Sequence, residues 1–193
     1  MILDIVNYGH PALRTKGTKI GKVTAELRKL AEDMLDTMYE ASGVGLAAQQ
    51  VAKTIQICVI DICGATRPSR LFFSGIEVNP EDYMPMVLIN PVLTLEGVLV
   101  AENEGCLSFP ELGGRIPRPE RVKVEALNLK GEKLTFLAEG FLARAVQHES
   151  DHLNGVLFID RMVSTDKAKI EKEYKAIYRA TRKSLEIQAK KSS

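Results

Sequence analysis

The sequence predicts an α+β fold, in which mostly antiparallel sheets surround a central metal-binding helix, with one N-terminal and one C-terminal helix. Residues 24–41 and the segment from 164 onward repeat apolar side chains every three or four residues, which is typical of amphipathic helices. Residues 121–137 alternate apolar and charged side chains around a Lys-Gly turn, which predicts a β-hairpin. Residues 139–154 are expected to form the central helix.

The other predicted elements connect these three in chain order. The first helix is expected to end at Ser42-Gly43, because glycine favours a helix stop. Gly155 follows the central helix in the position of a C-terminal cap. Residues 64–85 are rich in Pro, Gly and polar residues and are predicted to be irregular. The remaining strands are expected at residues 55–60, 86–89, 92–100, 121–129 and 134–137.

The length and composition indicate one domain. A chain of 193 residues, 45% hydrophobic and 26% charged, is ordinary for a soluble globular protein with a core. We expect a catalytic part at residues 1–163. A basic amphipathic helix at residues 164–193 is expected to belong to the same domain.

Charge is concentrated in the C-terminal segment. From Asp166 onward there are nine Lys or Arg and four Asp or Glu, although the whole chain carries a net charge of only +1. A basic segment on a slightly acidic body can bind an anionic surface. The alternative is a helix packed on the body with a solvated basic face.

No targeting or membrane segment is expected. The N-terminal residues lack a basic stretch followed by an apolar run, and no run of about 18 apolar residues predicts a membrane span. The three cysteines form an odd, sparse set, which argues against a disulfide framework and for a cytoplasmic location. We expect Cys58 and Cys63 in the core, which leaves Cys106 for chemistry.

The most informative segment is QHESDHLNG, residues 147–155. Residues four apart share one face of a helix, so His148 and His152 can direct nitrogen atoms at one metal ion. Glu149 can then act on a water beside that ion without ligating it, which is the position of a general base. The pattern predicts a metal-dependent hydrolase.

Two other kinds of metal protein share this pattern. A zincin peptidase would need a third ligand, but the position used by one branch holds Phe158, and the other branch would need a later carboxylate such as Glu171 or Glu173. A structural zinc would close the fourth position with protein and would not need a glutamate at position 149.

Two upstream segments complete the candidate site. Cys106 lies in EGCLS, residues 104–108, where it can present a thiolate to the histidine helix. The segment GVGLAAQQ, residues 43–50, contains two glycines that allow close approach of backbone to a ligand. The remaining histidine, His10, precedes a proline in a turn and is interpreted as a structural or surface residue.

Together these segments resemble the peptide deformylase family. GVGLAAQQ, EGCLS and QHESDHLNG stand in the family's order, and the similarity extends from Tyr8 to about Met162. The resemblance implies removal of the formyl group from N-formylmethionyl nascent polypeptides, with release of formate. It also implies Fe²⁺, with Zn²⁺, Ni²⁺ or Co²⁺ as substitutes, although the ligand chemistry alone suits zinc equally well.

The resemblance also implies roles for individual residues. Glu149 would be the general base, and the Gln50 side chain and the Leu107 backbone N–H would hold the oxyanion. Arg144 would face substrate or solvent. The implied metal ligands are Cys106, His148 and His152. The expected substrate-binding residues are Gly43, Val44, Gly45, Gly105, Phe141 and Ala145. The alternative for Val44, Phe141 and Ala145 is a place in the core.

The expected partners follow from the same resemblance. They are N-formylmethionyl nascent peptides and, through the basic C-terminal helix, the ribosome, with no DNA and no membrane. A competing hypothesis is a non-catalytic, ribosome-associated module in which the metal only supports the fold.

Overall fold

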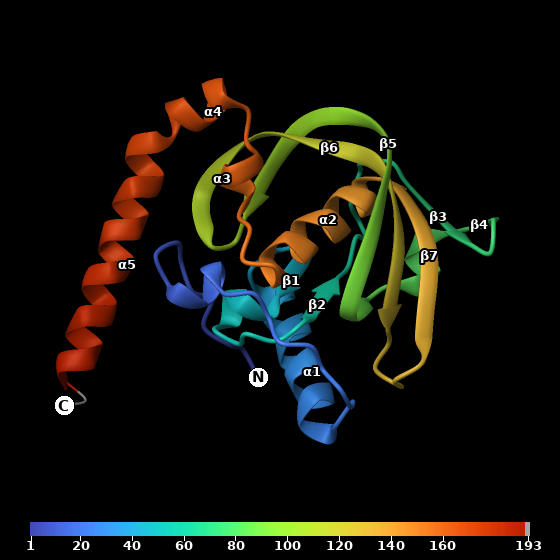
Figure 1. Ribbon diagram of the computed structural model, residues 1–193, viewed down its shortest axis with the longest axis horizontal. Coiled ribbons are helices and arrows are strands. Elements are labelled where there is room, and N and C mark those ends of the chain that lie inside the picture. Colours follow the sequence, from blue (N-terminus) through green and yellow to red (C-terminus); the bar gives the residue numbers. More distant parts are fainter. Residues whose placement is uncertain (192–193) are drawn as a thin grey trace.

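The computed structural model describes residues 1–191 and has an α+β fold built on one seven-stranded sheet. Paired neighbouring strands are antiparallel, in the order β1-β2-β5-β6-β7-β3-β4, which confirms the predicted α+β class with antiparallel strands. The sheet curls around helix α2 (Figure 1). The strands are β1 Gly45–Ala47, β2 Ile57–Ile60, β3 Ser69–Phe73, β4 Ile76–Val78, β5 Met86–Cys106, β6 Phe109–Leu127 and β7 Lys133–Gly140.

The first α-helix forms where the apolar spacing predicts it. The Thr24 side chain accepts a hydrogen bond from the Leu27 N–H at 3.3 Å, so Thr24 caps the N-terminus of α1. His10 caps a short 3₁₀ helix in the same way, which confirms its structural role. The helices of the described chain are η1 Pro11–Arg14, α1 Ala25–Glu40, η2 Ala48–Val51, η3 Pro80–Tyr83, α2 Phe141–Leu153, α3 Phe158–Arg161, α4 Ser164–Lys169 and α5 Glu171–Lys191.

Helix α2 is the central helix of the fold. All of its residues after Phe141 are buried, and it packs against strands β1, β2, β3, β6 and β7. It begins two residues later than predicted, because β7 continues to Gly140 and pairs there with Ser69. A Cβ at Gly140 would lie 2.4 Å from the Pro68 carbonyl oxygen, so only glycine fits at this change from strand to helix. Gly155, with φ of +72°, follows the end of α2 as predicted.

Residues 64–85 are not irregular, so that prediction is wrong. They form β3, β4 and η3, and β3 pairs with β7 at the end of the sheet opposite β1. The prediction of two strands at residues 86–89 and 92–100 is also wrong, because β5 is one long strand. A register shift between Ile89 and Val92 accommodates Asn90, whose φ is +52°, together with Pro91.

Strand β6 begins at Phe109, well before the predicted residue 121. Pro117 and Pro119 discourage a strand prediction because proline has no N–H to donate. Strand β7 pairs with β6 only from Arg121 onward, so the prolines lie where β6 has a sheet partner on the β5 side alone. A proline costs no hydrogen bond on such a free edge.

The C-terminal segment forms two helices, not one. The chain leaves helical geometry at Ile170, between α4 and α5. Tyr174 is buried, and its ring lies 6.1 Å from that of Tyr8, so α5 packs on the N-terminal segment (Figure 1). The last two residues of the predicted segment 164–193 lie outside the described residues. Nowhere in residues 1–191 is a helix long and apolar enough to cross a membrane.

The two cysteines predicted to be core residues differ. Cys58 is fully buried on β2 and packs in the cluster that joins α2 to the sheet. Cys63 is exposed in the turn after β2, so its predicted burial is wrong. Its backbone N–H donates to Asp61 Oδ1 at 2.8 Å, which accounts for the tight turn at this point.

Candidate active site

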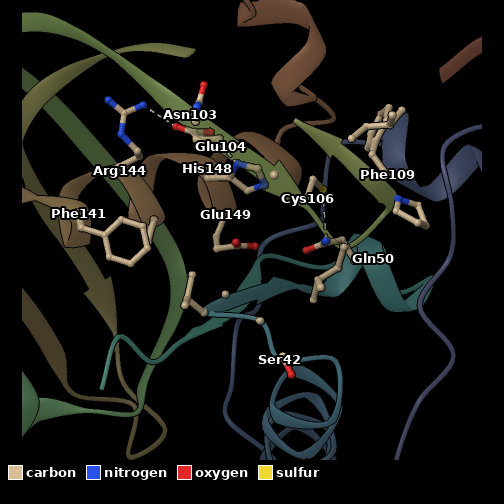
Figure 2. Close-up of a pocket in the computed structure, with 18 of the residues that line it drawn as sticks. Ser42, Gln50, Asn103, Glu104, Cys106, Phe109, Phe141, Arg144, His148 and Glu149 are labelled. Carbon is tan, nitrogen blue, oxygen red and sulfur yellow. Dashed lines mark hydrogen bonds and ion pairs between the residues drawn. The ribbon is translucent and has the colours of Figure 1, made fainter. Parts of the chain in front are cut away.

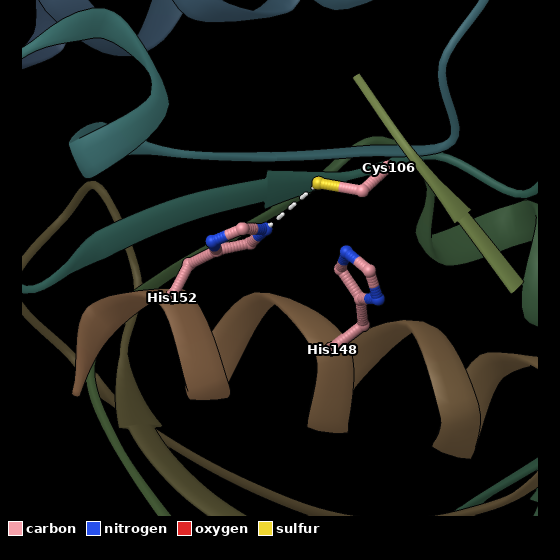
Figure 3. Close-up of side chains that lie close together, drawn as sticks. All are labelled: Cys106, His148 and His152. Atoms are coloured by element: carbon pink, nitrogen blue, oxygen red, sulfur yellow. Dashed lines mark hydrogen bonds between the residues drawn. The ribbon is translucent and has the colours of Figure 1, made fainter. Parts of the chain in front are cut away.

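The structure brings Cys106, His148 and His152 together (Figure 3). Cys106 is the last residue of β5, and the two histidines lie one turn apart on α2. One potential ligand atom from each residue lies within 4.8 Å of the other two. Cys106 Sγ is 3.3 Å from His152 Nε2. Residues separated by more than 40 positions in the chain thus meet at one point.

The donor set fits a divalent metal ion. One thiolate and two imidazoles are ligands that zinc and other transition metals accept. His148 Nδ1 donates a hydrogen bond to Glu104 Oε2 at 2.9 Å, which leaves Nε2 for a metal ion. The group has three members within residues 1–191, and Cys106 and His148 both line a cavity. Three potential ligands beside a cavity match a catalytic metal site better than a closed structural one.

Glu104 is a site residue to which the sequence analysis gave no role. Its carboxylate accepts two hydrogen bonds from Arg118, at 2.6 and 3.0 Å, and one from Arg144 at 2.7 Å. Burial opposes ionisation, but hydrogen bonds from His148 and Arg118 outweigh it and lower the pKa of Glu104 to about 2. The buried carboxylate therefore holds the His148 ring in one orientation.

Arg144 does not face solvent, which was one of its two expected positions; contact with the substrate, the other, stays a prediction. It is 5% exposed, and besides Glu104 it donates to the carbonyl oxygens of Ile116 and Val100, each at 2.8 Å. It also lines the cavity near its partner Glu104 (Figure 2). These bonds make Arg144 a structural part of the cavity wall.

Glu149 is buried beside the three-residue group (Figure 2). Its Oε2 atom makes no hydrogen bond to any residue in the part of the chain that the structure describes. Burial raises the pKa of Glu149 to about 7. A Cβ at Gly45 would lie 2.3 Å from Glu149 Oε1, so the glycine provides the space that the carboxylate occupies.

The amide nitrogen of Gln50 points toward Cys106 (Figure 2). Its Oε1 accepts the Ala47 N–H at 2.8 Å, and Nε2 lies 3.7 Å from Cys106 Sγ and 3.5 Å from Ser108 Oγ. The N-terminal segment fixes both backbones: Val6 N–H donates to the Gln50 carbonyl at 2.8 Å, and Tyr8 N–H donates to the Ser108 carbonyl at 3.0 Å. Gln50 is therefore oriented before any ligand binds.

One cavity of about 560 Å³ collects the candidate residues. His152 is the exception, since it is 1% exposed and does not line the cavity. Arg67 and Asn103 also line the cavity and were not predicted. No local pattern singles them out, because their place depends on how β3 and β5 meet α2. The predicted residues on the cavity are Gly43, Val44, Gly45, Gln50, Gly105, Cys106, Leu107, Phe141, Ala145, His148 and Glu149.

A cavity with a Cys/His/His group beside a buried carboxylate is typical of metal-dependent hydrolases. The family model described as polypeptide deformylase matches residues 2–168. A peptide deformylase of Methylacidiphilum infernorum is 46% identical over 179 residues, which cover 93% of this chain and 94% of that relative. One of Opitutus terrae is 42% identical, with 97% and 98% covered. The solved structure of peptide deformylase from Thermus thermophilus has a TM-score of 0.78 at 34% identity, with 95% and 99% covered.

The chain belongs to the polypeptide deformylase family, whose enzymes are metal-dependent and remove the N-terminal formyl group from new polypeptides. The zincin alternative is therefore wrong. Phe158, at one zincin ligand position, is buried in the apolar core, and the charged residues Glu171 and Glu173 are exposed on α5.

Proposed function

We propose that this chain deformylates N-formylmethionyl nascent polypeptides in the cytoplasm, with Glu149 as the general base. The observation that carries the proposal is a buried carboxylate, one oxygen of which has no hydrogen-bond partner within residues 1–191, beside three convergent side chains that could ligate a metal. Cys106, His148 and His152 would hold the ion, for which we propose Fe²⁺, with Zn²⁺, Ni²⁺ or Co²⁺ as substitutes. When bound, such an ion supplies Lewis-acid polarisation and lowers the pKa of water.

Glu149 moves protons in the proposed reaction. It takes a proton from the attacking water and returns one to the leaving amine, which yields formate and a free N-terminus. Its burial favours this role, because a proton acceptor removed from bulk water keeps the proton near the reacting atoms.

Gln50 and Leu107 stabilise the negative charge that develops on the formyl oxygen. The Gln50 amide and the Leu107 backbone N–H are the proposed donors. Removing one such preorganised donor costs about 2.7–4 kcal/mol in comparable sites. The bond from Ala47 to Gln50 Oε1 supports the assignment, because it directs Nε2 into the cavity without help from substrate.

The glycine-rich walls bind the peptide. Gly43, Val44 and Gly45 lie on one side of the cavity and Gly105 on another, and an extended peptide pairs with these backbones as an added strand. Phe141 and Ala145 line the part of the cavity that receives the methionine side chain.

Two further proposals concern the catalytic part of the chain and its C-terminal segment. Residues 1–163 form the catalytic part, and the segment from 164 packs onto it through buried Tyr174. The basic residues of α5 would contact ribosomal RNA, an idea supported by the net positive charge of this segment.

Formate release from formyl-Met-Ala-Ser by the metal-loaded protein tests the activity. The Glu149→Gln variant should retain the metal, measured by elemental analysis, and lose turnover by at least about 100-fold. A wild-type protein that contains metal and yields no formate would contradict the proposal. Elemental analysis after purification without oxygen identifies the native ion.

A further inference from the structure

The segment at residues 64–85 reaches the catalytic cavity through one side chain. Arg67, which stands just before β3, is the residue of this segment that lines the cavity within the described chain. Its exposed fraction is intermediate, whereas Arg70 of the same segment is exposed. The segment is therefore part of the cavity wall.

Arg67 is held there by an aromatic ring and a carboxylate. Its guanidinium carbon lies 4.4 Å from the centre of the Phe141 ring, a cation–π contact. Arg67 also forms an ion pair with Glu102, and Glu102 contacts Arg144 Nε at 3.2 Å. Since Arg144 in turn bonds Glu104, alternating charges connect Arg67 to the carboxylate that orients His148.

The position of this contact matches the length of a methionine side chain. His148 and Phe141 are seven residues apart on α2, which corresponds to about 10 Å along the helix. Six covalent bonds separate a formyl carbon from the terminal methyl of methionine, or roughly 7–8 Å in extended form, and a van der Waals contact adds about 3.5–4 Å. If the methionine side chain of a substrate whose formyl group lies beside His148 runs along α2, its methyl would reach the Phe141–Arg67 contact.

We infer that Arg67 is a specificity-determining residue: with Phe141 it closes the end of the cavity that receives the first side chain of the substrate, and so limits its length. This inference rests on the proposed function. The cation–π contact with the Phe141 ring and the ion pair with Glu102 place the guanidinium at this end of the cavity, where a longer side chain would meet it.

The test compares two substrates that differ in the length of the first side chain. Formyl-Met-Ala-Ser is compared with its 2-aminooctanoyl analogue, whose side chain is two atoms longer. Arg67→Ala should raise the ratio of kcat/KM for the long substrate to that for the methionine substrate by about tenfold, because two further methylenes become buried. Arg67→Gln, which is shorter than arginine but still polar, should raise the ratio less, and it replaces Arg67→Ala if that variant unfolds.

Arg70→Ala is a matched control. Arg70 lies in the same segment, forms ion pairs with Glu77 and Glu139, and has its guanidinium 4.7 Å from the centre of the Phe72 ring, but it does not line the catalytic cavity. The ratio should stay within twofold of wild type in this variant.

The outcomes separate the inference from the function on which it rests. If the wild type releases formate from formyl-Met-Ala-Ser but folded Arg67→Ala leaves the ratio unchanged, the role of Arg67 is wrong and the function stands. An equal shift in Arg70→Ala would also overturn the role of Arg67, because the segment would then act as a whole. No formate from the metal-loaded wild type would overturn the function itself.

Discussion

Gly45 has no side chain, and the carboxylate of Glu149, the proposed base, occupies the space beside it. Because a Cβ there would overlap Glu149 Oε1 at 2.3 Å, the Gly45→Ala variant must displace either the carboxylate or strand β1. Misplacing a reacting group by about 1 Å can cost about 100-fold in rate. We therefore expect kcat/KM for formate release to fall by about that factor.

Gly21→Ala is the matched control for this substitution. A Cβ at Gly21 would meet no atom of residues 1–191 within 4 Å, and the residue does not have a positive φ. Its kcat/KM should match that of wild type within twofold. Full activity in Gly45→Ala would show that Glu149 does not need its present position.

Glu104 supports the site through charge. Glu104→Gln would remove the negative charge shared by the buried side chains of Arg118, Arg144 and His148. Breaking such a buried ion pair typically costs about 3–5 kcal/mol, and we expect a loss of this order in the free energy of unfolding, measured by urea denaturation. The exposed pair of Glu77 and Arg70 provides the comparison, since Glu77→Gln should lower the free energy of unfolding much less than Glu104→Gln.

These residues differ in how far the sequence could identify them. His148 and His152 share a face wherever the segment is helical, so their spacing alone predicts a joint ligand set. Glu104 carries no comparable signal, because its role depends on Arg118 and Arg144 arriving from β6 and α2. The space at Gly45 is likewise defined by a contact between β1 and α2.

Among the elements, the helices were the most predictable from the sequence. The apolar period and the capping residue Thr24 determine α1 locally. Strands β3, β4 and the first half of β6 were missed, because proline and glycine in residues 64–85 and 109–120 normally indicate loops. They are strands here because long-range partners, β7 for β3 and β5 for β6, supply their hydrogen bonds.

Helix α5 should depend on one aromatic residue for its packing. Tyr174 is 9% exposed and contacts the Tyr8 ring, so Tyr174→Ala should lower the free energy of unfolding by about 3 kcal/mol. Ile187, on the same helix, is 47% exposed, and Ile187→Ala should change it by less than about 0.5 kcal/mol. Equal effects of the two substitutions, measured by urea denaturation, would contradict the packing described for α5.

Helix α4 is attached by a pH-dependent ion pair. Hydrogen bonds from the Arg115 side chain and backbone N–H hold the pKa of Asp166 below its usual value. Since the folded pKa lies below the unfolded value of about 3.9, the stabilisation is present at neutral pH and is lost as the pH falls through the folded value. Asp166→Asn should therefore lower Tm more at pH 7 than at pH 3. If Asp166→Asn lowered Tm equally at pH 7 and pH 3, the ion pair would not make the stability depend on pH in this way.

For the whole molecule, the three proposed ligands connect parts of the fold that are distant in sequence. Cys106 ends the long strand β5, whereas His148 and His152 belong to α2, which lies inside the curled sheet (Figure 1). The three residues meet only when β5 and α2 take their places in the fold. The site is therefore assembled only in the folded chain. An ion bound by all three residues would favour the native state over the unfolded one.

Removal of the metal should therefore lower Tm, and the loss should depend on Cys106. An ion present at 100 times its Kd stabilises the native state by about 2.7 kcal/mol, which corresponds to roughly 5–10 °C for a chain of this size. Differential scanning calorimetry with and without a chelator should show this shift in wild type and in Cys63→Ala, because Cys63 is exposed and outside the ligand group. Cys106→Ala should show little or none, since two imidazoles alone bind weakly. If Cys106→Ala kept the full shift, the ion would be held elsewhere and the ligand set proposed for this fold would be wrong.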